Sequence, residues 1–191
     1  GMAAPEEQVR RDLTGGVAQR LGDSYHRAWN DALRLAASVG EADGLEPMLD
    51  ADGAAERARH TAQEWTSEVT DIVRGQAQSS RVSGRLLAGG INVVTLSLMV
   101  SVFAMTGGVT GVEVGVAGAS AALSQTILES YFGERTVRAL ATQAREALER
   151  LAADSLAEVV APVATRLDNS REHERIDALE SALATAREAL V

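Results

Sequence analysis

The chain has 191 residues, of which 46% are apolar and 24% are charged, with a formal net charge of -9. This length suffices for one sizeable hydrophobic core, and an aromatic content of only 3% favours close-packed helices over a sheet sandwich. All 18 basic residues are arginine, so the chain holds no lysine for a phosphate-binding loop or a Schiff base. It also lacks cysteine, which excludes disulfides and thiol chemistry, and its acidic balance argues against a nucleic-acid partner.

The first third of the chain shows helical periodicity interrupted by one connector. Apolar residues recur at steps of three and four over 3–39, which predicts one amphipathic helix or two, because Gly15–Gly16 weakens the pattern. Glycine, proline and acidic residues predict a connector over 40–53. A further helix is predicted over 54–85, with Trp65 as the anchor of its apolar face.

A long apolar run, 86–128, is the most unusual part of the sequence, because Glu113 is its only formal charge in 43 residues. The run divides at the pair Gly107–Gly108 into two arms of 20 residues each, 86–105 and 109–128. Each arm corresponds to about 30 Å of helix, which matches the hydrocarbon thickness of a bilayer. The short turn requires the arms to be antiparallel, whether lipid or protein surrounds them.

Two features of the second arm give candidate functional positions. Small residues every fourth position form a strip that allows two helix backbones to approach closely, in membranes and in soluble bundles alike. Glu113 either occupies the first turn of a helix, where the helix dipole favours an acid, or needs a partner within the apolar run. On the first arm, Asn92, Thr95, Ser97 and Ser101 are candidates to hydrogen-bond across the pair. The candidate residues for membrane contact or helix packing are Leu98, Val102, Phe103, Gly107, Gly108, Gly111, Glu113, Gly115 and Gly118.

Long helices are predicted over 134–191, with a bend or a break at Pro162. Near the end, apolar residues alternate at steps of three and four, which is a heptad seam of about two repeats and too short to form a stable coiled coil alone. The candidate self-association residues of this seam are Ile176, Leu179, Leu183 and Leu190.

The sequence predicts no catalytic residue, no metal site and no cofactor. His26, His60 and His173 are far apart, and none belongs to a metal-binding motif. Arginines precede the first apolar arm and follow the second, whereas the turn between the arms has no basic residue. By the positive-inside tendency, both ends of a membrane hairpin would be cytoplasmic. A solvated helix face explains the same arginines equally well.

Three segments suggest a family resemblance. They are the run Thr-Gly-Gly-Val-Thr-Gly-Val-Glu-Val-Gly over 106–115, the segment Leu-Glu-Ser-Tyr-Phe-Gly-Glu over 128–134, and Val-Arg-Ala-Leu over 137–140. Together they resemble the C-terminal region of actinobacterial GTPases of the dynamin-like or Era-like type, over about Trp65 to Leu167. The resemblance implies a GTPase domain upstream in the same protein and a hairpin that associates with membranes. No nucleotide-binding loop is present here, so GTP hydrolysis is not expected of this chain.

These observations predict an all-α fold, an elongated bundle of about five or six helices around a central antiparallel apolar hairpin. The predicted single domain covers 3–191, since Gly1 and Met2 are typical of a cloning remnant. The favoured function is a non-catalytic helical domain that couples a GTPase to a membrane or a partner. The alternatives are a soluble oligomerisation or scaffolding bundle with the hairpin as its core and, less favoured, a pore-forming domain. The expected partners are lipid, further copies of the chain and the GTPase domain, and the expected location is the cytoplasm, including the inner face of the cell membrane.

Overall fold

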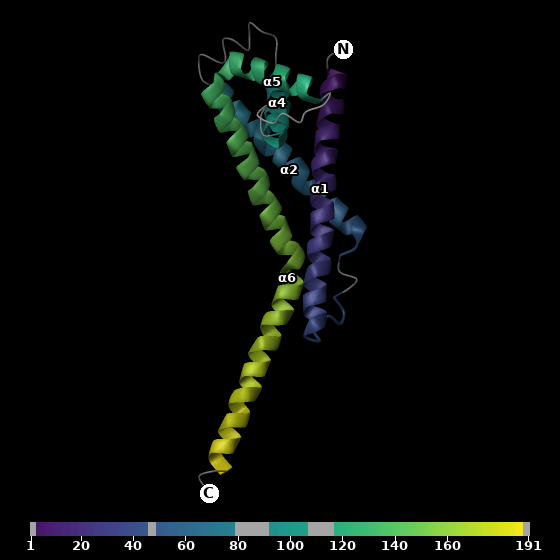
Figure 1. Cartoon of the computed structure of the whole chain (residues 1–191), viewed down its shortest axis with the longest axis vertical. Coiled ribbons are helices and arrows are strands. Elements are labelled where there is room, and N and C mark those ends of the chain that lie inside the picture. Colours follow the sequence, from purple (N-terminus) through teal and green to yellow (C-terminus); the bar gives the residue numbers. More distant parts are fainter. Residues whose placement is uncertain (1–2, 46–48, 79–91, 107–116, 189–191) are drawn as a thin grey trace.

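The computed structural model describes the backbone of 3–45, 49–78, 92–106 and 117–188, and the side chains of 7–45, 49–78, 92–105 and 125–171. Every regular element in these residues is a helix. The helices are α1 (Ala3–Ser38), α2 (Ala51–Ala77), α4 (Val93–Thr106), α5 (Ala117–Phe132) and α6 (Glu134–Glu188). They form an elongated bundle with α4 and α5 at one end, and this confirms the all-α prediction (Figure 1).

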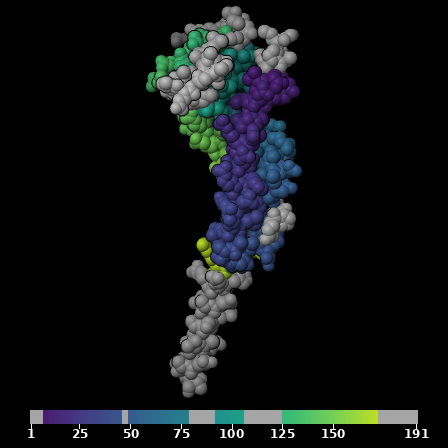
Figure 2. All heavy atoms as spheres, turned by 45° about the vertical axis from the view of Figure 1, so that its right-hand side comes forward, coloured from purple at the N-terminus to yellow at the C-terminus, as the bar shows by residue number. Residues whose placement is uncertain are grey.

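Helix α1 is continuous through the two glycines that were expected to weaken it. A glycine in a helix interior costs about 1 kcal/mol relative to alanine. Directly after Gly15–Gly16, Val17 and Ala18 are buried in the bundle core, and this packing offsets the cost. Helices α1 and α2 lie side by side along the shaft of the molecule (Figure 2).

Helix α2 begins at Ala51, a few residues before its predicted start, because Asp50 caps it. The Asp50 carboxylate accepts a hydrogen bond from the backbone N–H of Gly53 at 2.7 Å, which satisfies one of the free donors of the first turn. The connector before it turns at Gly40 and Gly44, both with positive φ.

Helix α2 is the central element, since it contacts α1, α4 and α6. Its buried residues recur at steps of three and four, as an amphipathic helix requires. They are Ala54, Ala58, Thr61, Ala62, Trp65, Val69, Val73 and Ala77. Small residues on this stripe allow the neighbouring helices to approach closely.

Two hydrophobic clusters follow one another along the bundle. The first, here called the Trp65 core, combines residues of all five helices at the end that holds α4 and α5. The second, the Trp29 core, combines α1, α2, the connector and α6. Both tryptophans are at most 1% exposed, so each core is organised around one large aromatic side chain.

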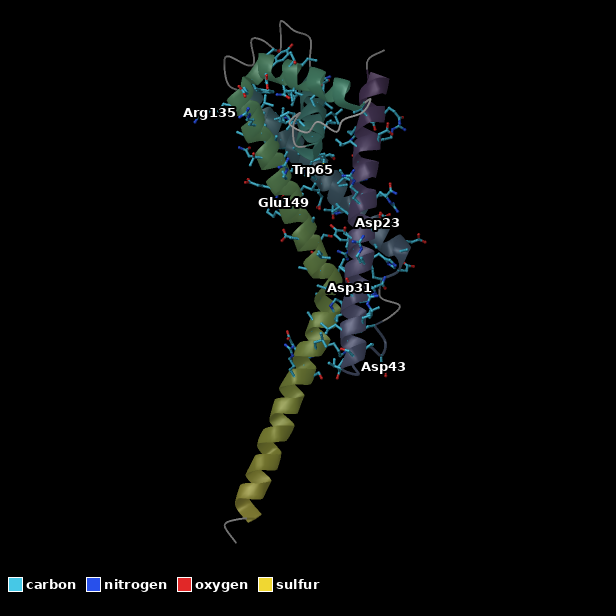
Figure 3. All side chains as sticks on the ribbon, viewed as in Figure 1. Asp23, Asp31, Asp43, Trp65, Arg135 and Glu149 are labelled. Atoms are coloured by element: carbon cyan, nitrogen blue, oxygen red, sulfur yellow. The ribbon has the colours of Figure 1, made fainter. Side chains whose placement is uncertain are left out.

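Polar contacts fix α2 against α6. The indole Nε1–H of Trp65 donates to the carbonyl oxygen of Ala144 at 2.7 Å, and Figure 3 shows this tryptophan inside the bundle. Arg150 pairs with Glu68 at 2.6 Å, and this carboxylate raises the pKa of the guanidinium. An exposed ion pair of this kind contributes little to stability on its own, so the buried indole is the main polar contact here.

Helix α6 continues through Pro162, so the proline does not break it. The proline removes one helical hydrogen bond, but Val159 and Val163 on either side are buried in the Trp29 core and hold the helix in place. Figure 1 shows the axis of α6 changing direction partway along, and its C-terminal part extends beyond the other helices.

We predict that Trp65→Phe lowers the free energy of unfolding by about 1 kcal/mol more than Trp29→Phe does. Both side chains are buried, but among the described residues the Trp29 Nε1–H has no hydrogen-bond partner, whereas that of Trp65 donates to Ala144. Trp29→Phe therefore removes an unsatisfied donor, and Trp65→Phe removes a satisfied one. Urea unfolding of the two variants tests this, and equal losses would contradict the assigned role of the indole N–H.

Candidate functional site

The site centres on α4, which is the described part of the first apolar arm. Asn92 marks its N-terminus, because its side-chain oxygen accepts from the backbone N–H of Thr95 at 2.8 Å and its carbonyl accepts from Leu96 at 3.3 Å. The Ser97 hydroxyl donates to the carbonyl of Val93 at 2.7 Å, one turn back in the same helix. These hydrogen bonds are local to α4, whereas the sequence had suggested bonds across the hairpin.

Most of α4 is enclosed by other helices of the bundle. Leu96, Val100 and Ala104 lie in the Trp65 core, where α4 contacts α2 and α6. Two of the residues predicted for membrane contact or helix packing are buried too: Phe103 is 8% exposed and belongs to the Trp65 core, and Leu98 is 7% exposed and faces α1 and α2. A helix that is apolar on all sides is typical of such a buried position, and the described part of the arm fits this explanation.

The predicted residue Val102 is half-buried, so it is less enclosed than its neighbours. Val94, at 43% exposure, is the large apolar side chain of α4 that is most open to solvent. An aspartate substituted for Leu98 would place a charge at a buried position, so it would destabilise the fold whether or not lipid is present. Val94 is therefore the better position at which to examine lipid contact.

Arg145 of α6 caps the other end of α4. Its guanidinium donates to the carbonyl oxygen of Ala104 at 3.0 Å, within the last turn of α4. Carbonyl groups in the last turn lack helical partners, and a cation there is also favoured by the helix dipole. The two residues are 41 positions apart, so α4 is fixed at its C-terminus by a long-range contact.

Helix α5 joins α6 through Gly133. This residue has φ of 82°, and its N–H donates to the carbonyl of Glu129 at 2.8 Å, which is the usual way in which a glycine ends a helix. Leu128 on α5 is buried in the Trp65 core, and Tyr131 packs against that core. Helix α5 therefore closes the same end of the bundle that encloses α4.

The remaining predicted residues lie partly or wholly outside the described structure. Gly118 is in α5, and Ile176, Leu179 and Leu183 are in α6, but their surroundings are not described. Gly107, Gly108, Gly111, Glu113, Gly115 and Leu190 lie outside the described residues. Of the helices that are described, none has both the length and the apolar character that crossing a bilayer requires.

A groove of about 960 Å³ lies between α1 and α2, with α4 as its floor. Its α1 wall includes Arg10 and Arg11, and its α2 wall includes Arg59 and Arg74. Ser97, Leu98 and Ser101 are among the α4 residues of the floor. We call this feature the α1–α2 groove.

A smaller groove of about 550 Å³ lies between α2 and α6 and has an acidic lining. His60 and Glu64 approach to 3.4 Å there, on the exposed face of α2. Nowhere in the described ranges do three or more histidine or carboxylate side chains gather to hold a metal ion.

No protein-family model, curated protein or solved structure matches this chain. The described residues form a buried apolar helix, a groove lined by arginines and hydroxyl groups, and a helix that extends beyond the bundle.

Sequence reasoning identified α4 as important but missed two of these features. The Arg145 contact and the α1–α2 groove depend on how α4 packs against helices that are distant in sequence. Arg10, Arg11 and Thr14 alternate with apolar positions on α1, and this pattern indicates a solvated helix face but not a groove.

Proposed function

We propose that this chain is a non-catalytic helical domain of a GTP-binding protein and that it couples the GTP-binding domain to self-association. The observation that carries the GTPase part is the resemblance of 106–115, 128–134 and 137–140 to the helical region of actinobacterial dynamin-like or Era-like GTPases. The α5–α6 junction at Gly133 lies within the second of these segments.

The positions of the helix ends are compatible with such a coupling. The N-terminus of α1 lies at the end of the bundle that holds α4 and α5 (Figure 1). A domain joined before Ala3 would therefore be near the apolar helices. Movement of that domain would act first on α1 and on the helices packed against it.

The burial of α4 argues against direct lipid contact by this helix in the closed bundle, and therefore favours a protein as the partner. Leu96, Leu98 and Val100 are covered by the molecule's own helices, so they are unavailable to a membrane unless the bundle opens. Burial of each of these side chains stabilises the fold by about 2 kcal/mol. Opening of the bundle would lose this free energy unless membrane insertion supplied it again.

The C-terminal part of α6 supports self-association. It continues as a helix to Glu188 and extends beyond the other helices in Figure 1. On a helix, its seam of Ile176, Leu179 and Leu183 falls on one face at heptad spacing. In the same register Arg175 and Glu180 occupy positions that form ion pairs between the two strands of a parallel coiled coil. A second copy of the chain is thus the partner that this segment fits.

The GTPase part is tested by reading the gene upstream of the codon for Ala3. We expect an in-frame Gly-x-x-x-x-Gly-Lys-Ser/Thr loop, because a phosphate-binding loop of this form is needed to bind GTP. A start codon directly before Ala3, with no such domain in frame, would contradict the proposal.

The self-association part predicts an oligomer whose mass, measured by light scattering, rises with protein concentration. Leu183→Asp should shift the species toward monomer, since it places a charge in the seam, whereas Thr185→Asp, on the opposite face, should leave the oligomer intact. A monomer at all concentrations, or equal effects of the two variants, would contradict this part and leave the GTPase part standing.

A further inference from the structure

The α1–α2 groove concentrates positive charge on an acidic protein. Four arginines line it, Arg10, Arg11, Arg59 and Arg74, against two acidic residues, Glu7 and Asp71. The formal charge of the lining is therefore +2, on a chain whose net charge is -9. The arginines come from both walls, so an anion in the groove would meet guanidinium groups from two sides.

The ion pairs within the groove are weak enough to be replaced by a ligand. Arg10 pairs with Glu7, Arg74 with Asp71, and Arg59 with Glu56 beside the groove, in each case three residues apart on one exposed helix face. Exposed pairs of this kind contribute little to stability. Arg11 donates to the backbone carbonyl of Glu7 at 3.3 Å, which is a long hydrogen bond. Its guanidinium can therefore turn toward a ligand at small cost.

The remaining lining suits an oxygen-rich ligand. Thr14, Thr66 and Thr70 bring hydroxyl groups to the walls, and Ser97 and Ser101 bring them to the floor. The volume of about 960 Å³ is within the range of small-molecule sites. Figure 1 shows how the space arises, since α1 and α2 diverge toward the N-terminus of α1 and α4 lies between them.

We propose that the α1–α2 groove binds a ligand through phosphate groups, with Arg11 and Arg59 as contacts from opposite walls. Guanidinium groups form charge-assisted hydrogen bonds with phosphate oxygens, and their planar fork matches phosphate geometry. The phosphate belongs either to a soluble polyphosphate compound or to an anionic lipid headgroup. This inference does not depend on the proposed GTPase or self-association roles.

The test uses inorganic tripolyphosphate and calorimetric titration of the whole chain. We expect binding that weakens with added salt and becomes at least tenfold weaker in the double variant Arg11→Gln/Arg59→Gln, since this variant loses charge-assisted hydrogen bonds from both walls. The matched control is Arg20→Gln/Arg27→Gln, which removes two exposed arginines of α1 outside the groove. This control has the same net charge and should bind as the unmodified chain does.

A second arm separates the two sources of phosphate. The proteins are floated with vesicles of phosphatidylglycerol and phosphatidylcholine in equal parts, and with phosphatidylcholine alone. Flotation with the anionic vesicles that is lost in the groove variant supports a headgroup ligand. Tripolyphosphate binding without flotation supports a soluble ligand.

Two results would overturn the proposal. One is the absence of both tripolyphosphate binding and flotation by the unmodified chain. The other is an equal loss in the groove and control variants, which would show that net charge alone is responsible. Circular dichroism confirms that the variants are folded, which is expected because all four substituted side chains lie on exposed positions.

Discussion

The structure depends on the contact between the Trp65 indole and helix α6. A buried indole N–H is costly unless it donates to an acceptor, and in a helical core backbone carbonyls are the most abundant acceptors. The carbonyl of Ala144 can be reached because alanine lets the two helices approach closely. This contact fixes the position of α2 along α6. The two helices are antiparallel, because Arg57, near the start of α2, pairs at 2.7 Å with Glu158, which lies beyond Ala144 on α6.

Once α2 and α6 are fixed, the position of α4 follows. Its apolar side chains pack against both helices. Arg145, the residue after Ala144 on α6, donates a hydrogen bond to the Ala104 carbonyl in the last turn of α4. The apolar character of the described first arm is thus explained by enclosure on several sides. At the end of the bundle that holds α4, α1 and α2 diverge with α4 between them, and this leaves the α1–α2 groove open to solvent.

The sequence predicted those features that depend on local periodicity. The all-α class, the connector and the role of Trp65 as an anchor came from spacing and turn residues, and the structure agrees. The continuity of α1 through Gly15–Gly16 and of α6 through Pro162 was left open, because local propensity is unfavourable there and only tertiary packing decides. The burial of Leu98 among the helices could not be predicted either, since a helix that is apolar on all sides has the same sequence pattern in lipid and in a protein core. The Arg145 contact required knowledge of which helices meet.

Helix α4 is a core helix held by α2 and α6. Hydrogen exchange of the backbone amides in native conditions measures this most directly, because exchange is slow where a helix opens only with the whole fold. Amides from Val100 to Ala104 in α4 should be protected as strongly as those around Trp65 in α2. Exchange of the α4 amides at the rate of frayed helix ends, while the amides around Trp65 remain protected, would contradict the account.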